Sequence, residues 1–418
     1  MKSLQSLRIA VRPSASPRLA HQCVRPLSTT MQRFTQARRQ QSLPAAYYRG
    51  GTSRAIMIRR EDLPPDQTQW DPILLGCIGS PDPYGRQLDG MGGGISSLSK
   101  VCVVGPSTHP DADVDYTFIS LGIKTPHVDL SSNCGNMSAA VGPFAIDSGM
   151  IPLSSSESTT TTVRILNTNT NKIIHANFPI IDGEAQADGS FAIDGVAGTA
   201  SRIELRFIDP AGSRTGHLFP TGNHIDTIDA VPVTCIDAGN PCCFVEASAL
   251  GVSGVLTPQQ IDDHPSLKAQ LESIRRQAGV KMGLAGTEDD VPGSVPKIGF
   301  VSRPGGGEEG EGEGLVGNGN VVVRAMSVGQ PHKAVPVTVA LALATAANME
   351  GTVVSTCVVR DGDGQADSGS GSGSGLVIAH ASGTLEVDAR FDERGDVSFA
   401  TVFRTARRLM EGRVFWKG

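Results

Sequence analysis

The stretch that decides the fold reads SSNCGNMSAAVGPFAID and spans residues 131–147. Its first three residues, Ser131 to Asn133, are of the types that cap the N-terminus of a helix. The small and apolar residues after them predict a helix from Cys134 to Met150. Cys134 therefore stands where this helix begins, between asparagine and glycine.

A second long apolar helix is expected from Lys333 to Met349. Each of the two helices has strand-like segments before and after it, and a glycine-rich stretch ahead of it. This likeness in outline indicates two similar halves, each a curled sheet around one central helix, with a cleft between them. Both helix N-termini would face that cleft, where their dipoles would attract an anion.

Short segments rich in β-branched and aromatic residues predict strands with tight turns between them. One amphipathic helix is expected at residues 258–278. The 49 glycines and the aromatic content of 5% suit such short strands better than a bundle of long helices. The expected strands are 55–58, 101–104, 115–119, 161–166, 173–178, 201–207, 231–236, 243–246, 297–301, 321–326, 352–359, 376–381, 385–391 and 397–404.

The composition excludes several classes of function. The net charge of −6 argues against nucleic acid as a partner. No apolar run reaches the roughly 18 residues of a membrane-spanning helix, so no membrane partner is expected. Eight cysteines occur without a C-x-x-C pair, which makes a zinc site or a disulfide framework improbable. We therefore expect no metal.

Residues 1–40 hold eight basic residues and no acidic residue. Such a segment, rich in arginine and serine, is typical of a mitochondrial presequence. It predicts a disordered leader that is removed in the matrix. A basic tail without function is the alternative, and Met31 could start a shorter cytoplasmic product. Without these eight charges the net charge of −6 would become −14.

Residues 305–320 and 362–375 consist almost entirely of glycine with glutamate, serine or aspartate. Segments of this composition cannot bury enough apolar surface to offset the entropy that ordering costs. Both are expected to be mobile surface loops.

Two residues stand out as candidates for chemistry. Cys134 lies at a helix start, where the dipole favours the thiolate form, although free cysteines are more often buried structural residues. Lys100 ends the small-residue run GGGISSLSK, where it could anchor a ligand or carry a proton, or be a surface lysine.

Two glycine turns are expected to bind carboxylates through backbone amides. The first is Cys134-Gly135-Asn136 at the helix start, and the second is Thr221-Gly222-Asn223. Arg49, Arg86 and Lys333 would be supporting charges. The alternative is that these glycines only make turns and that the charged residues are solvated.

Seven motifs in this order resemble the PrpF-type 2-methylaconitate isomerase family over about residues 46–404. They are GGTSR, DPYGRQLDGMGGGISSLSK, DVDYTF, SSNCGNMSAAVGPFAID, LFPTGN, IDAGNP and MSVGQPHKAVPVTVALALA. The resemblance implies an α+β fold like that of diaminopimelate epimerase, with two similar lobes, each a curled, mostly antiparallel sheet around a central helix. The lobes would be residues 46–228 and 229–418, with the C-terminal strand able to return to the first lobe.

The resemblance also implies an isomerase that shifts protons on small tricarboxylates without a cofactor, with Lys100 and Cys134 as the catalytic pair. The leading expectation is conversion of 2-methyl-trans-aconitate to the cis form in propionate breakdown. Alternatives are isomerisation of cis- and trans-aconitate, a methylitaconate-type double-bond shift, or a carboxylate-binding protein without activity. A homodimer is possible. The substrate would contact Arg49, Thr52, Ser53, Arg86, Ser97, Asn133, Gly135, Asn136, Met137, Thr221, Gly222, Asn223, His332 and Lys333.

Overall fold

The computed structural model describes residues 39–152, 159–305, 319–360 and 375–417. The expected presequence, apart from its last two residues, lies outside this range. So do most of the two glycine-rich stretches, 305–320 and 362–375. Arg39–Gly418 forms one unit, and the expected boundary between residues 228 and 229 stays a prediction.

The first half of the chain builds strands around the helix α2 (Gly135–Asp147). Helix α2 is buried on all sides because its small residues let strands approach closely. A Cβ at Gly142, for example, would lie 2.6 Å from the ring of Phe178. The elements that precede and follow it are β1 (Gln41–Gly50), β2 (Ser53–Arg59), α1 (Trp70–Ile78), β3 (Lys100–Pro106), β4 (Val114–Leu121), β5 (Val128–Asp129), β6 (Thr160–Asn167), β7 (Lys172–Ile181), β8 (Glu184–Ala185) and β9 (Ile203–Ile208).

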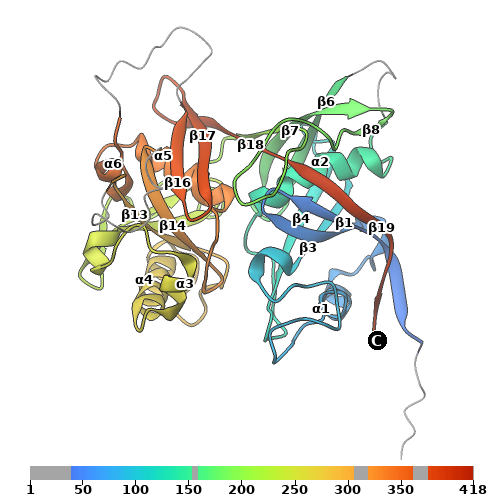
Figure 1. Ribbon diagram of the computed structural model, residues 1–418, viewed down its shortest axis with the longest axis horizontal. Coiled ribbons are helices and arrows are strands. Elements are labelled where there is room, and N and C mark those ends of the chain that lie inside the picture. The colour runs from blue at the N-terminus through green and yellow to red at the C-terminus, as the bar shows by residue number, and fades with distance from the viewer. Residues whose placement is uncertain (1–38, 153–158, 306–318, 361–374, 418) are drawn as a thin grey trace, which may run out of the picture. The chain divides into compact units, whose positions relative to one another are not determined.

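The second half surrounds the helix α5 (Val337–Ala347) in the same way (Figure 1). Its elements are β10 (Asp226–Ile228), β11 (Val231–Asp237), β12 (Pro241–Glu246), α3 (Pro258–Asp263), α4 (Leu267–Lys281), β13 (Lys297–Ser302), β14 (Val321–Ser327), β15 (Gln330–Pro331), α6 (Val353–Cys357), β16 (Leu376–His380), β17 (Gly383–Phe391) and β18 (Val397–Arg404). The side chains of α5 are buried along its whole length.

The two halves repeat one pattern of strand pairing. In the first, β1–β2 is antiparallel, β2–β3 parallel, β3–β4 antiparallel, β4–β6 parallel and β6–β7 antiparallel. In the second, β11–β12, β12–β13, β13–β14, β14–β16 and β16–β17 follow the same order of directions. Each central helix is inserted after the fourth strand of its set. This mostly antiparallel arrangement with few helices confirms the α+β class.

Two further pairings join the ends of the halves. Strand β9 pairs antiparallel with β18, which links the last strand of each set. Strand β19 (Ala406–Trp416) then runs antiparallel along β1, and Figure 1 shows the two ribbons side by side. The C-terminus thus packs on the first strand of the chain.

Three expectations about secondary structure were wrong. Residues 352–359 were expected to be a strand, but Val353–Cys357 is the helix α6, because the Thr352 side chain accepts a hydrogen bond from Ser355 N and caps it. The helix at 258–278 is divided into α3 and α4, since His264 precedes a proline and takes an extended conformation. Helix α5 begins at Val337 and not at Lys333, because Pro336 occupies its N-cap.

Candidate active site

The amine of Lys100 lies beside the thiol of Cys134 in the interior of the protein. Lys100 is the first residue of β3, and its side chain is only 9% exposed. Its Nζ donates hydrogen bonds to Cys134 Sγ at 3.4 Å and to Ser53 Oγ at 3.0 Å. The ring centroid of Phe118 lies 5.7 Å from the same nitrogen. A proton could therefore pass between the amine and the thiol without a change of backbone.

Cys134 occupies the N-cap position of α2. Its backbone is extended, with φ −111° and ψ 93°, and its carbonyl accepts the first helical hydrogen bond from Ser138 N. No side chain caps this helix start among the described residues. The first amides of α2 keep the partial positive charge of the helix dipole, next to the thiol.

The start of α5 meets the start of α2 at this point. A Cβ added at Gly135 would lie 2.6 Å from Val337 Cβ, so only glycine fits between the two helices. We expected this glycine to leave room for an anion. Gly135 also has a structural role, because the absence of a side chain lets the N-termini of α2 and α5 come into contact.

Asn240 holds the two helix starts together. Its side chain is fully buried in the turn between β11 and β12. The Oδ1 accepts from Asn133 N at 3.0 Å, and Nδ2 donates to Asn133 O at 2.8 Å and to Thr338 Oγ1 at 3.3 Å. One amide group thereby fixes the residue before Cys134 and the first turn of α5.

Residues of both halves line one narrow pocket between these helix starts, which we call the Lys100 pocket. Its volume of about 30 Å³ is close to that of a single water molecule. A tricarboxylate enters only if the walls move apart. The lining residues are Ser96, Lys100, Phe118, Ser120, Ser132, Asn133, Cys134, Gly135, Asn136, Ser294, Lys297, Ser327, Val328, His332, Pro336, Val337 and Thr338.

Positive charge dominates the Lys100 pocket. Burial lowers the pKa of Lys297, and the neighbouring Lys100 lowers it further. Loss of hydration lowers the pKa of His332 to about 3, with smaller contributions from the same two lysines, so the imidazole is neutral near pH 7. The pocket therefore offers cationic and neutral groups to a ligand, which suits an anion with several carboxylates.

Asn136 is oriented by residues behind the pocket. Its Nδ2 donates to Thr52 Oγ1 at 3.2 Å, and its Oδ1 accepts from Arg404 Nε at 3.2 Å. Arg404 is buried, and this burial lowers its pKa to about 10. Thr52 and Ser53, both predicted to bind substrate, thus support Asn136 and Lys100 without lining the pocket themselves.

The structure brings six of the predicted residues to the pocket wall, namely Lys100, Asn133, Cys134, Gly135, Asn136 and His332. Two others are neighbours in sequence of pocket residues but do not line the pocket. Ser97 belongs to the short 3-10 helix Ser96–Leu98, whose first residue, Ser96, lines the pocket instead. Met137 is fully buried in the core around α2.

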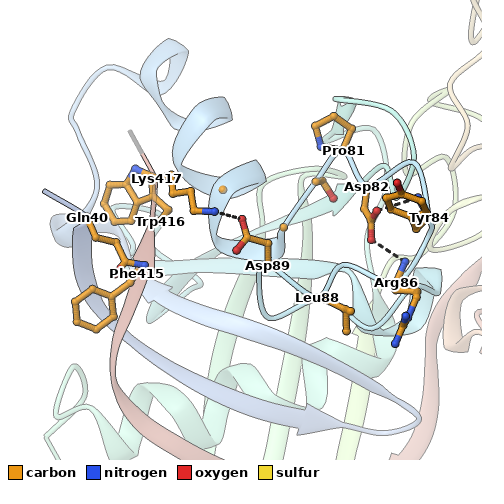
Figure 2. A pocket seen from close by; sticks show the side chains of 13 residues that line it. Gln40, Pro81, Asp82, Tyr84, Arg86, Leu88, Asp89, Phe415, Trp416 and Lys417 are labelled. Carbon is orange, nitrogen blue, oxygen red and sulfur yellow. Dashed lines mark hydrogen bonds and ion pairs between the residues drawn. The ribbon is translucent and has the colours of Figure 1, made fainter. Parts of the chain in front are cut away.

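Arg86 lies in a different cavity, of about 340 Å³, shown in Figure 2. This cavity is larger than the Lys100 pocket, but it contains neither Lys100 nor Cys134. Asp82 accepts hydrogen bonds from the backbone of Tyr84, Arg86 and Gln87, which shapes the loop into a turn. The DPYGR motif therefore builds its own loop, and size alone does not mark the site of chemistry.

The turn Thr221-Gly222-Asn223 does not line the Lys100 pocket either. Thr221 Oγ1 donates to Asp226 Oδ2 at 2.6 Å, and Asn223 Nδ2 donates to Asp226 Oδ1 at 3.3 Å. We expected the backbone amides of this turn to meet a substrate carboxylate, but Gly222 N donates to Phe219 O at 3.0 Å and Asn223 N donates to Thr221 Oγ1 at 3.3 Å.

Arg49 and Lys333 also lie away from the pocket. The Arg49 guanidinium donates to the carbonyls of Gly51 and Thr405, and so holds the turn between β1 and β2 against the end of β18. The side chain of Lys333 is exposed. Neither provides the supporting charge that we expected at this wall of the pocket.

Sequence reasoning missed Lys297, Ser294 and Asn240. Lys297 was placed at the start of the expected strand 297–301 without a functional role, and Asn240 was seen only as part of IDAGNP. The signal that could have found Lys297 is its position at the start of a buried strand, which is also the position of Lys100 at β3.

Six other described cysteines are buried, and burial raises the pKa of Cys77, Cys235 and Cys242 to about 12. Within the described residues, no group of three His, Cys, Asp or Glu side chains is placed to hold a metal ion. In the same part of the chain, no helix is both long and apolar enough to cross a bilayer.

Comparison with known proteins places this architecture among isomerases. The family model described as PrpF protein matches residues 40–417. The chain is 38% identical to the 3-methylitaconate isomerase of Eubacterium barkeri, over 90% of this chain and 97% of that protein. It is also 38% identical to the 2-methyl-aconitate isomerase of Cupriavidus necator, covering 89% and 96%.

Two further comparisons extend this result. The (4E)-oxalomesaconate Delta-isomerase of a Novosphingobium species is 38% identical, with 90% of this chain and 98% of that protein covered. The crystal structure of a methylitaconate-delta-isomerase superposes with a TM-score of 0.69 at 37% identity, covering 90% of this chain and 96% of the other.

Proposed function

The chain belongs to the PrpF family, and on that premise we propose that it isomerises aconitate-type acids by removing and returning one proton. The observation that carries the proposal is the contact of 3.4 Å between Lys100 Nζ and Cys134 Sγ. This pair lies in a buried pocket lined by a second lysine and by two helix N-termini. It therefore combines a proton carrier with a receptor for carboxylates.

The reaction follows from the acidity of an allylic C–H bond next to a carboxylate. A base breaks this bond, and its electrons enter a dienolate whose negative charge spreads onto the carboxylate. The original double bond is then a single bond and can rotate. Return of the proton to the same carbon gives the other geometric isomer, and its return to the far carbon of the dienolate gives the shifted double bond.

Lys100 is the group that we assign to the proton transfer, with Cys134 exchanging a proton with it. The amides at the start of α2 and the nearby cations stabilise the charge that develops on the carboxylate. Once the substrate is in place, the helix start and the lysines are held by the fold, so little reorganisation is needed during the proton transfer itself.

The proposed substrate is 2-methyl-trans-aconitate, converted to the cis isomer in the methylcitrate route of propionate breakdown. Interconversion of cis- and trans-aconitate, or a methylitaconate-type shift, uses the same groups. Relatives named for three different acids are all 38% identical to this chain, so identity alone does not choose among them.

Proton NMR in deuterated water tests the function. Cis-aconitate, trans-aconitate and 2-methylaconitate are incubated in parallel with the purified protein. We expect new vinyl signals and incorporation of deuterium at the allylic carbon, fastest with the methylated acid. A protein that binds these acids but neither isomerises nor deuterates any of them is a carboxylate-binding protein, and the proposal is wrong.

We also propose that turnover requires no metal ion and no organic cofactor. The support is that a lysine, a thiol and helix dipoles supply every proton and charge that the reaction needs. Protein dialysed against EDTA should keep its full rate in the NMR assay. Loss of activity that one divalent metal restores would contradict this proposal.

The proposed location is the mitochondrial matrix, with cytoplasm as the alternative if translation starts at Met31. Its support is the basic composition of residues 1–40. A fusion of residues 1–45 to a fluorescent protein should enter mitochondria, and the same fusion started at Met31 is the control. A diffuse signal from the longer fusion would rule out this location.

A homodimer is the proposed assembly. Among the described strands, β19 pairs only with β1, and its exposed side chains include Leu409, Met410 and Phe415. An edge strand with apolar side chains is a site where a second copy can pair. Light scattering of the purified protein measures its mass, and a monomer at micromolar concentration would contradict the proposal.

A further inference from the structure

We infer that Lys297 binds a carboxylate of the substrate and is the counterpart of Lys100 from the second half of the chain. The inference rests on the proposed function only for the class of ligand, a small acid with several carboxylates. Lys297 lies in none of the seven sequence motifs.

The internal repeat relates Lys297 to Lys100. Lys100 is the first residue of β3, which runs parallel to β2 and antiparallel to β4. Lys297 is the first residue of β13, which runs parallel to β12 and antiparallel to β14. The two lysines thus hold corresponding positions in the two halves, and both line the same pocket.

Lys297 is buried beside no carboxylate of the described residues. Lys297 is 9% exposed, and the described residues place no carboxylate oxygen within 4.0 Å of its ammonium. Lys100 is in the same situation. Two buried cations in one pocket repel each other and lose hydration, a cost that fold stability alone does not explain. An anionic ligand removes both penalties.

Asp129 is a carboxylate whose charge raises the pKa of Lys297, against the larger effect of burial, but its oxygens are already engaged. Its Oδ1 accepts from Ser131 N and Ser131 Oγ, and its Oδ2 accepts from Ser294 N. These hydrogen bonds lower the pKa of Asp129 although burial opposes them. The carboxylate therefore holds the loop of Ser294 in place, and it leaves Lys297 to the pocket.

The ammonium group of Lys297 has more N–H donors than the protein uses in the described structure. An ammonium carries three N–H donors, and Lys297 Nζ makes one hydrogen bond in the described structure, to Ser294 O at 3.1 Å. That bond anchors the side chain at the pocket wall. The remaining N–H groups are available to a carboxylate, which accepts charge-assisted hydrogen bonds.

The roles of the two lysines then differ by their neighbours. Lys100 touches Cys134 Sγ, a group that can exchange a proton. Among the described residues, the only hydrogen-bond partner of Lys297 Nζ is the carbonyl oxygen of Ser294, which cannot exchange a proton. Lys297 therefore holds charge, and the carboxylate that it binds is fixed across the pocket from the proton carrier.

The test uses three unreactive ligands and calorimetric or thermal-shift titration. Tricarballylate carries three carboxylates, glutarate lacks the central one, and 2-methylsuccinate lacks a terminal one. Lys297→Met should weaken tricarballylate about 10- to 100-fold, as expected for a lost charged hydrogen bond. One of the two dicarboxylates lacks the carboxylate that Lys297 binds. The affinity for that acid should be the same in Lys297→Met as in the wild-type protein.

Two variants complete the design. Lys297→Gln keeps a donor for the Ser294 carbonyl but removes the charge, so it replaces the methionine variant if that one does not fold. Lys281→Met, an exposed lysine at the end of α4 in the same half, is the matched control and should bind all three acids normally.

Equal weakening of all three acids by both Lys297 variants means a purely structural lysine and overturns the inference. So does unchanged binding of all three. The three ligands do not react, so their binding can be measured whether or not the protein is an isomerase. A wild-type protein that binds them but isomerises none of the aconitates refutes the proposed function, and the binding test of Lys297 stays valid. Full isomerase activity in Lys297→Gln refutes the inference and leaves the function intact.

Discussion

Replacing Lys100 by methionine is the sharpest test of the assignment of proton transfer. Methionine is of similar length and fills the same space, but it can neither carry a proton nor donate to Cys134 Sγ and Ser53 Oγ. The contribution of a positioned acid–base group is about 10²- to 10⁴-fold. We therefore expect kcat to fall by more than about a hundredfold, which is at least about 2.7 kcal/mol of transition-state stabilisation.

The structure limits how much stability this change can cost. Lys100 Nζ makes two hydrogen bonds, to Ser53 Oγ and to Cys134 Sγ, each worth about 1 kcal/mol net. Against that loss, methionine removes a buried charge that has no carboxylate partner. The free energy of unfolding should change by less than about 2 kcal/mol, so the variant should fold and its inactivity should be chemical in origin.

The assay is the NMR experiment in deuterated water, read as isomerisation and as deuterium incorporation. Cys134→Ala is the comparison, and we expect it to lose less activity than Lys100→Met, because the amine and not the thiol is the main proton carrier. A Lys100→Met protein close to wild type, beside an inactive Cys134→Ala protein, would show that the two roles are reversed.

Three further predictions concern how the pocket is built. Asn240→Ala leaves the backbone N–H and C=O of Asn133 without partners, so the free energy of unfolding in chemical denaturation should fall by about 2–4 kcal/mol. We also expect a lower kcat. If both quantities are unchanged, Asn240 does not bridge the helix starts. The Ser131→Cys and Ser294→Cys double variant replaces two hydroxyl oxygens that lie 2.8 Å apart, so its thiols can form a disulfide across the pocket. Because the pocket must open to admit a substrate, the oxidised protein should be inactive. The reduced protein is the control and should be active. Folding lowers the pKa of His332 from 6.5 to about 3. Between these two pH values the unfolded chain binds a proton at His332 and the folded protein does not, so the free energy of unfolding should decrease as the pH falls below about 6.5. His332→Gln should flatten that decrease, and an identical pH profile would contradict the buried neutral imidazole.

The sequence predicts the parts of this fold that carry local signals. The two central helices were placed within a few residues, because capping residues and small apolar runs mark them clearly. Residues 352–359 were misread, since VVSTCVV has the β-branched composition of a strand. The cap from Thr352 decides the conformation there, and a single hydroxyl outweighs the propensity of its neighbours.

The residues of the site were likewise predicted only as far as their neighbours in sequence identify them. Glycine turns and arginines can be recognised along the chain, but the pattern does not say which cavity they face. Arg86 therefore entered the predicted site although it lines another cavity. Lys297 was overlooked for the opposite reason, because its surroundings in sequence are plain and only strand pairing reveals its relation to Lys100.

The internal repeat explains why the site needs both halves. Each half contributes a helix N-terminus and a lysine at the start of a buried strand, and neither half alone surrounds a substrate. Because the pocket between the helix starts has a volume of only about 30 Å³, its walls must move apart when a substrate binds. A carboxylate bound by Lys297 would then replace part of the repulsion between two cations by an attraction. We therefore expect an uncharged analogue of the same shape to bind weakly, because it fills the space without pairing with Lys297.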